Sequence, residues 1–450
     1  MNAARKSPGR AFSFIVHGSS FIVCFGLLYA TTAFGAEPVT VSADRLLAAG
    51  LRTVVGKHLT LYTDLPPSPA VDELPAVFDT AVPQWAAYFS IEPAAISSWR
   101  MNCFLMRDAA RFRAAGLLPA ELPPFKNGYS VFPDLWFYEQ PNDYNRRHLL
   151  LHEGTHGFMA SQFGGFGAPW YMEGVAELLA THRWSDGSLT LGIMPRNRDE
   201  APDLGRIKLV KDAIAAGRRT SLAEILNYKR DAHLVNETYG WCWALAVMLD
   251  GDPRYRERFR ALQRRAADPQ FNDHFRQAFA AELPSIARQW VVFADGLEFG
   301  SDPIRTAIDF TPGVVLPADG AKLTVAADRG WQNTGIRLEA GKSYRLQATG
   351  RYQIAESTDA AGAKQPWSCE PGGVSIRYYR GRPLGQLLAA IEPDAPMAGE
   401  PPAMLSPTVV GLETTLRPMT TGTLYLRVND SDGELHDNAG MLTAEIAASP

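Results

Sequence analysis

The segment His-Glu-Gly-Thr-His at residues 152–156 constrains the chain most, because it places two imidazoles and a carboxylate within five residues. Residues 145–162 have the periodicity of a helix. Side chains four positions apart in a helix lie one turn above each other, so His152 and His156 can bind one metal ion. Glu153 points away from that ion but lies near enough to take a proton from a metal-bound water. The motif also occurs by chance, so the residues around it must support the interpretation as a metal site.

An acidic pair follows on the next predicted helix, which begins at Pro169. Glu173 and Glu177 are four residues apart and therefore share one face of this helix. Glu173 can complete a His-His-Glu ligand set that leaves the fourth zinc position for water, as in catalytic sites. Glu177, one turn later, is expected to orient a ligand imidazole from behind. A solvated acidic face is the alternative, which the apolar neighbours Trp170 and Leu178 disfavour.

With these residues the chain resembles the gluzincin zinc metallopeptidases, in which H-E-x-x-H is followed by a glutamate on the next helix. In the aminopeptidase branch of this family the third ligand lies in an Asn-Glu-Gly-type motif, and residues 172–174 read Met-Glu-Gly. The family also has a tyrosine that opens a later helix and stabilises the oxyanion, and Tyr239 is similar to it in its surroundings. The resemblance therefore implies zinc as cofactor, Glu153 as general base and Tyr239 as oxyanion donor. An ordinary core aromatic is the alternative for Tyr239.

Further histidines carry weaker signals. His148 extends the histidine stripe of the predicted helix, but the ends of that stripe lie about 12 Å apart along the axis. All three side chains therefore cannot bind one ion, and His148 is expected to be a packed or rim histidine. No motif surrounds His182, His233 or His274.

Residues 1–35 are predicted to be a secretory signal peptide. Basic residues precede a short apolar run at 21–30, and small residues follow at a spacing suited to cleavage after 35 or 36. The run is short for a membrane span, which needs about 20 residues. We therefore expect a protein exported to the periplasm or beyond the cell, without a membrane span after cleavage. An uncleaved N-terminal anchor is the alternative.

The cysteines allow little cross-linking. Cys103, Cys242 and Cys369 remain after signal cleavage, and an odd number permits at most one pair among them. Cys103 and Cys242 are one option, because both fall in the predicted catalytic region.

A multidomain chain is expected from its length and patterning. Residues 37–300 are predicted to form an α+β gluzincin-like catalytic domain, with a mixed lobe over 51–140 and a helical lobe over 222–299. Gluzincins resemble this order of lobes, with the zinc between them. The strand at 135–138 is expected to be the edge strand that holds an extended peptide substrate; a buried hairpin is the alternative.

The pattern changes after Pro312 to short β segments separated by Gly, Asp and Pro turns. Such spacing is typical of an all-β sandwich. Residues 301–317 are therefore predicted to be a linker and residues 318–450 an accessory β sandwich.

The stretch at 424–440 resembles the calcium loop of the small galactose-binding jelly-roll lectins of bacteria, which implies a jelly roll. The resemblance assigns calcium-binding oxygens to Asp430, Glu434, Asp437 and Asn438. Residues 356–371 contain no clear equivalent of the other sugar-contacting loop, so galactose binding does not follow from the fold. A polar hairpin turn without metal is the alternative.

The sequence is compatible with two functions. The first is an exported zinc peptidase acting on a peptide or protein, and the missing Gly-x-Met-Glu-Asn motif of aminopeptidases favours internal cleavage or another substrate class. The second is a cell-surface carbohydrate-binding protein with a calcium-dependent C-terminal module and a vestigial zinc domain. The net charge of −4 favours neither nucleic acid nor an anionic membrane surface as partner.

Overall fold

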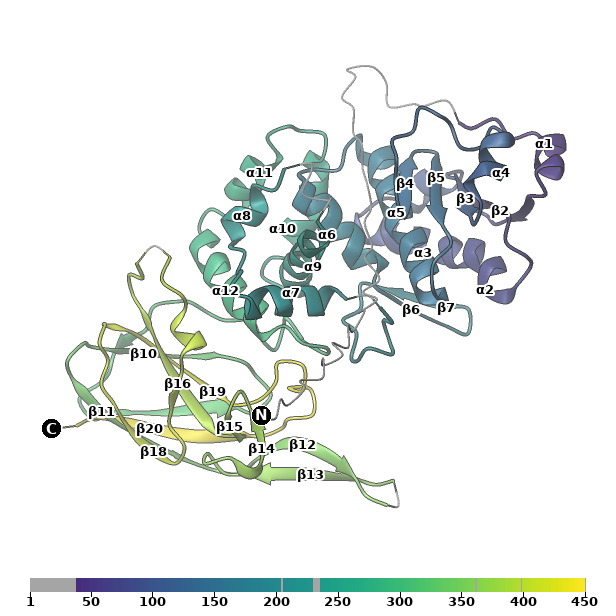
Figure 1. The fold of residues 1–450 in the computed structure, drawn as a ribbon. Helices are drawn as coiled ribbons and strands as arrows, with labels where there is room; N and C mark the ends of the chain where they lie inside the picture. Colours follow the sequence, from purple (N-terminus) through teal and green to yellow (C-terminus); the bar gives the residue numbers. More distant parts are fainter. Residues whose placement is uncertain (1–37, 204, 230–234, 361, 398, 450) are drawn as a thin grey trace, which may run out of the picture.

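The computed structural model describes residues 38–449 except 204, 230–234, 361 and 398. The predicted signal peptide at 1–35 and His233 lie outside the described residues. An α/β lobe, a helical lobe and a β sandwich follow one another along the chain (Figure 1). This arrangement is consistent with the expected multidomain chain whose C-terminal region is rich in β structure.

A five-stranded mixed sheet forms the centre of the first lobe, with strand order β1-β2-β3-β5-β4. β2, β3 and β5 are parallel, whereas β1 and β4 are antiparallel to their neighbours. The elements of this lobe are α1 (Ala43–Ala48), β1 (Arg52–Val55), β2 (Leu59–Thr63), α2 (Pro69–Asp72), α3 (Leu74–Tyr88), η1 (Pro93–Ile96), β3 (Met101–Met106), α4 (Ala109–Ala114), β4 (Gly128–Val131) and β5 (Asp134–Tyr138).

The prediction that residues 135–138 form the edge strand is wrong, because the edge is the neighbouring strand. Residues 135–138 belong to β5, which lies between β3 and β4, and the edge is β4. β4 and β5 form the hairpin that the sequence offered as the alternative. The hairpin reverses the chain, so its first strand takes the edge position while its second pairs with β3.

Two helices carry the residues of main interest. α5 (Asp143–Phe163) begins at Asn142, whose side chain accepts a hydrogen bond from the Asn145 N–H. It ends at Gly164, whose left-handed conformation (φ 66°) suits glycine. α6 (Pro169–Ala180) begins with proline at its first position, where no backbone N–H is needed. Both helices are buried along most of their length because α5 packs against the sheet and α6 packs against α9.

The helical lobe begins with a short hairpin of two strands. Its elements are β6 (His182–Ser185), β7 (Ser188–Leu191), α7 (Arg206–Ala215), α8 (Leu222–Leu226), α9 (Asn236–Gly251), α10 (Arg256–Ala261), η3 (Leu262–Arg265), α11 (Phe271–Ala278) and α12 (Leu283–Gly296). One hydrophobic core runs through both lobes, from Leu59 on β2 to Trp290 on α12. Helices α5 and α6 are therefore held between two halves of a continuous core.

The C-terminal region is a sandwich of two sheets, with orders β17-β16-β19-β10-β8 and β18-β11-β20-β9. Its main strands are β8 (Val314–Val315), β9 (Ala321–Ala326), β10 (Gln332–Leu338), β11 (Ser343–Thr349), β16 (Leu387–Pro393), β17 (Thr408–Val409), β18 (Glu413–Leu416), β19 (Gly422–Val428) and β20 (Met441–Ser449). Two hairpins add β12 (Tyr352–Thr358) to β13 (Lys364–Cys369) and β14 (Val374–Tyr379) to β15 (Arg382–Leu384). A separate hydrophobic core fills the space between the sheets. Strand β8 falls within the segment 301–317 that was expected to be a linker, and it pairs in parallel with β10.

The sandwich packs against the end of α12. Val292 on this helix lies in a small apolar cluster with Trp331 and Tyr425 of the sandwich. Ser431 donates a hydrogen bond to Glu298 Oε2 at 2.6 Å. A Cβ on Gly300 would lie only 2.6 Å from the Gly433 carbonyl oxygen, so the two backbones meet closely. Apolar, polar and backbone contacts thus join the two regions.

Cys103, Cys242 and Cys369 are all free and buried. The Cys103–Cys242 pairing considered above is therefore wrong. None of the helices in the described residues combines the length and hydrophobicity that a bilayer crossing requires.

Candidate metal centre

His152, His156 and Glu173 form a compact group of donor atoms that could hold a metal ion. The two Nε2 atoms are 3.0 Å apart, and Glu173 Oε2 lies 3.4 Å from the first and 3.7 Å from the second. Nitrogen ligands at 2.0–2.1 Å from a tetrahedral zinc ion are separated by about 3.3 Å. The three donors therefore have the spacing of one face of such a tetrahedron, and the residues fit the metal.

A close approach of α6 and α9 sets the position of Glu173. The next residue, Gly174, faces α9, and a Cβ there would lie 2.7 Å from the Cys242 carbonyl oxygen. Glycine lets the two backbones come together and brings the preceding carboxylate to α5. In the Met-Glu-Gly segment, Glu173 is thus the candidate ligand and Gly174 allows the close packing of α6 on α9.

The group is buried and electrostatically biased toward a cation. His152 and His156 are fully buried and Glu173 is 3% exposed. Burial opposes a charge on His152, but Glu173 and Glu177 outweigh it and raise the pKa of this imidazole to about 10. Burial likewise opposes the charge on Glu173, but His152 and His156 lower its pKa to about 2. The pair of carboxylates thus favours positive charge at the place where the ligand atoms converge.

Glu153 is buried beside this group, next to the edge strand. Burial raises its pKa to about 8, and the charge of Glu173 adds to that rise while His152 opposes it. The backbone of Gly128 on β4 passes directly against it, and a Cβ there would lie 2.5 Å from Glu153 Oε1. The edge strand therefore fixes where this carboxylate can lie.

Glu177 contacts His152 at Nδ1, whereas the Nε2 atom of this ring faces the other two donors. Its Oε1 is 3.2 Å from His152 Nδ1, and its Oε2 is 3.3 Å from His148 Nε2. Arg206 donates to both carboxylate oxygens, at 2.7 and 2.8 Å, from the first turn of α7. Arg206 could not be singled out from the sequence, because no motif surrounds it and its contact with Glu177 spans 29 residues.

His148, His152 and Glu177 form a second group with donor atoms at metal-binding spacing. Here, however, the guanidinium of Arg206 already contacts both oxygens of the carboxylate. A fixed positive charge at those oxygens disfavours a second cation. The group of His152, His156 and Glu173 is therefore the better candidate for a metal centre, and His148 is a packed histidine, 2% exposed.

Tyr239 lies close to the centre, on the first turns of α9. Its ring centroid is 6.4 Å from that of His152, and the Arg206 guanidinium carbon is 5.3 Å from the same ring. Burial raises the pKa of the Tyr239 hydroxyl well above its usual value, and Glu173 and Glu177 raise it further. The phenol therefore stays protonated and retains a proton to donate.

The structure brings together only some of the residues assigned to calcium. Asn438 donates to Asp430 Oδ2 at 2.9 Å, and both residues are buried. Asp437 is the next residue along, and its Oδ2 accepts from the Glu356 N–H at 3.3 Å. The carboxylate of Glu434 pairs instead with Arg377, at 2.8 Å. A polar cluster thus exists at this loop, with Glu434 engaged elsewhere.

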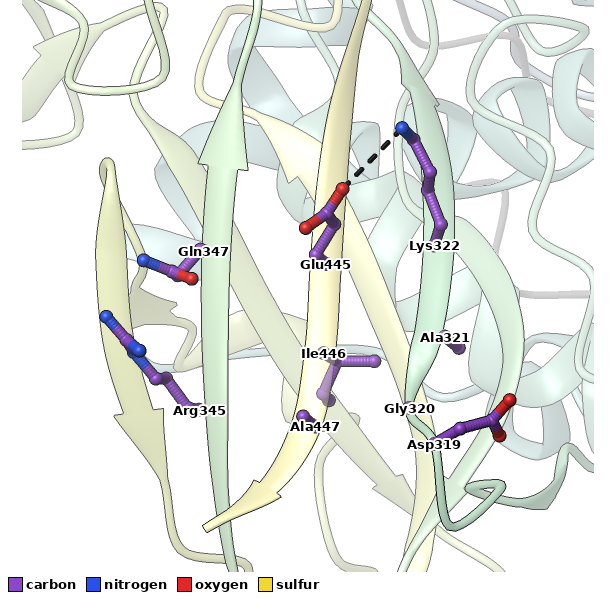
Figure 2. Close-up of a pocket in the computed structure, with 9 residues that line it drawn as sticks. All are labelled: Asp319, Gly320, Ala321, Lys322, Arg345, Gln347, Glu445, Ile446 and Ala447. Carbon is purple, nitrogen blue, oxygen red and sulfur yellow. Dashed lines mark ion pairs between the residues drawn. The ribbon is translucent and has the colours of Figure 1, made fainter.

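A hollow on the outer face of the four-stranded sheet is shown in Figure 2. It lies between β9, β11 and β20, and Lys322 and Glu445 pair across its rim at 3.5 Å. Arg345 pairs with Glu413 on the neighbouring strand. These charged side chains are exposed and neutralise one another, which is typical of the solvated face of a sheet.

Comparisons with known proteins do not identify a family for this chain. No family model matches the chain, and no curated protein matches it. Among solved structures, the chain matches one described as "EclA N-terminal domain; PllA-like lectin" with 22% identity and a TM-score of 0.20. The match covers 28% of this chain and 95% of that one. A TM-score this low does not establish a common fold.

Proposed function

We propose that the chain is an exported zinc-dependent peptidase that hydrolyses internal peptide bonds. The observation that carries the proposal is the spacing of His152, His156 and Glu173, together with the buried carboxylate of Glu153 beside them. When bound, zinc supplies a Lewis acid for the scissile carbonyl and lowers the pKa of a coordinated water. Three protein ligands leave a position for that water, which distinguishes a catalytic site from a structural one.

Glu153 takes the role of general base in this proposal. A carboxyl group whose pKa is raised to about 8 by burial binds and returns a proton near neutral pH, as efficient proton transfer requires. It is adjacent in sequence to His152 but is not a member of the ligand group. Glu153 accepts the proton of the attacking water and later delivers it to the leaving amine.

Tyr239 is assigned to the developing oxyanion. Its hydroxyl keeps its proton, and its ring lies beside His152. A hydrogen bond that is made only in the transition state accelerates the chemical step rather than strengthening substrate binding. Tyr239 thus serves as the hydrogen-bond donor to the developing oxyanion.

The edge strand β4 supports a peptide as substrate. Within the described sheet, β4 pairs only with β5, so its other edge has no neighbouring strand. Its first residue, Gly128, lies against Glu153. An extended peptide could add to this edge by main-chain hydrogen bonds and present its carbonyl to the centre. The missing amine-anchoring motif of aminopeptidases is the reason to propose internal cleavage.

The Glu153→Gln substitution tests this function. Gln keeps the size of the side chain but removes its basicity, so zinc content should stay equal to wild type while hydrolysis of a peptide library falls below detection. The wild-type protein treated with a chelator serves as the metal-free control. Turnover by the Gln variant at wild-type rate would contradict the proposed mechanism.

A second candidate function concerns the C-terminal loop. One buried side-chain oxygen each of Asp437 and Asn438 has no hydrogen-bond partner among the described residues. The Asn438 amide contacts the Asp430 carboxylate, and Asp437 is the residue before Asn438. Such oxygens are the ligands that calcium prefers. We therefore keep calcium-dependent glycan binding as the alternative function, to be tested by calorimetry with calcium and simple sugars. Absence of calcium-dependent heat would remove it.

A further inference from the structure

We propose that Arg206 is a positioning residue of the metal centre, acting through Glu177 to hold His152 in its metal-binding orientation. The inference deepens the proposed function and rests on it, because it presumes that the first donor group binds the metal. It concerns a residue that the ligand motif does not include.

The contacts form a continuous path from α7 to the centre. Arg206 grips the Glu177 carboxylate at two points, with hydrogen bonds of 2.8 and 2.7 Å. The same carboxylate faces His152 Nδ1 at 3.2 Å, while His152 Nε2 faces the other donors. A two-point grip fixes the rotation of a carboxylate, whereas a single hydrogen bond would leave it free to turn. Arg206 therefore fixes the atom that in turn orients the His152 ring.

All members of this path are buried, so their charges are poorly screened. Arg206 and Glu177 are 3% and 1% exposed. A buried carboxylate without its cation is strongly destabilised. His148 Nε2 also lies 3.3 Å from Glu177 Oε2. Arg206 is therefore the positive charge that balances the Glu177 carboxylate within this buried path.

The start of α7 is held where this contact requires it. A Cβ on Gly240 of α9 would lie 3.1 Å from the Arg206 carbonyl oxygen, so glycine permits the close approach of the two helices. Gly240 directly follows Tyr239, whose ring lies 5.3 Å from the Arg206 guanidinium carbon. The same guanidinium therefore contacts both the orienting carboxylate and the proposed oxyanion donor.

Zinc affinity of the full chain provides the test, measured by competition with a chromophoric chelator and independent of hydrolysis. Arg206→Met keeps the side-chain length but removes the charge, and loss of such an orienting contact weakens metal binding by about 10- to 100-fold. Arg146→Met is the matched control, because Arg146 is a 7% exposed arginine on α5 that pairs with Asp143 at 2.8 Å and does not reach the ligands. Its zinc affinity should stay within about threefold of wild type.

A double substitution separates positioning from general destabilisation. If Arg206 acts through Glu177, then adding Arg206→Met to Glu177→Gln should change zinc affinity little beyond the effect of Glu177→Gln alone. Arg206→Lys, which keeps the charge without the two-point grip, should give an intermediate affinity and covers the case in which Arg206→Met does not fold.

Three results would overturn the inference and leave the proposed function standing. These are an Arg206→Met affinity equal to that of the Arg146→Met control, an undiminished effect of Arg206→Met in the Glu177→Gln background, or wild-type affinity in Arg206→Lys. A wild-type protein that binds no zinc would overturn both this inference and the proposed function. A protein that shows the expected zinc affinities but cleaves no peptide would contradict the proposed function alone.

Discussion

Replacing Gly128 by alanine should impair catalysis without affecting metal binding. The added Cβ would lie 2.5 Å from Glu153 Oε1 and 3.0 and 3.1 Å from the Cγ and Cδ atoms of the same side chain. Ordinary contact begins near 3.4 Å, so the carboxylate must retreat by roughly 1 Å. A displacement of about 1 Å in a catalytic group can lower a rate by about 100-fold, which corresponds to about 2.7 kcal/mol in the activation free energy.

The assay is the kcat for a cleaved peptide, measured at equal zinc content. Zinc affinity should remain near wild type because Glu153 is not one of the three donors. Gly372→Ala in the sandwich is the control, since the nearest atom to its added Cβ is a Leu412 side-chain carbon at 4.0 Å. A Gly128→Ala protein with bound zinc and wild-type kcat would refute the view that β4 positions the general base.

Tyr239→Phe should lower kcat by about 100- to 1,000-fold while KM and zinc affinity change little, because an oxyanion donor acts only in the transition state; an unchanged kcat would leave Tyr239 as a core aromatic. Cys103, Cys242 and Cys369 should not react with a thiol reagent in the native protein, since burial raises the pKa of each thiol, and should all react in denaturant; rapid native labelling would contradict their burial. Burial raises the pKa of Asp430 from 3.8 to about 6, so the folded state favours the protonated carboxyl and the resulting stability is lost as pH rises through 6. If calcium binds Asp430, it should raise the Tm at about pH 7.5 and have little effect at about pH 5, and equal shifts at both pH values would count against that site.

Local spacing in the sequence accounts for most of the candidate metal centre. The i, i+4 relation of His152 and His156 and the proline that opens α6 depend only on helix geometry, so the sequence sufficed for them. The third donor, Glu173, also needs α6 to pack beside α5, and its place in the Met-Glu-Gly segment resembled the third-ligand motif of a known family. The β sandwich was predictable for a similar reason, because the spacing of its strands and turns is local.

Features that depend on distant pairing were not predictable. The edge position of β4 is set by which hairpin strand joins β3, and the hydrophobic pattern is the same in either case. Arg206 reaches Glu177 only because α7 packs on α9, and an isolated arginine in the sequence is most often a surface residue. The absence of a Cys103–Cys242 bond likewise follows from tertiary distance rather than from cysteine number.

The contact between α12 and the sandwich bears on how the protein can be dissected. Val292 shares an apolar cluster with Trp331 and Tyr425, and Ser431 bonds to Glu298 across the same junction. A fragment ending near residue 300 would expose Val292 to water, and the isolated sandwich would expose the two aromatic rings. Each half made alone should therefore be prone to self-association, whereas the intact chain should melt as one cooperative unit.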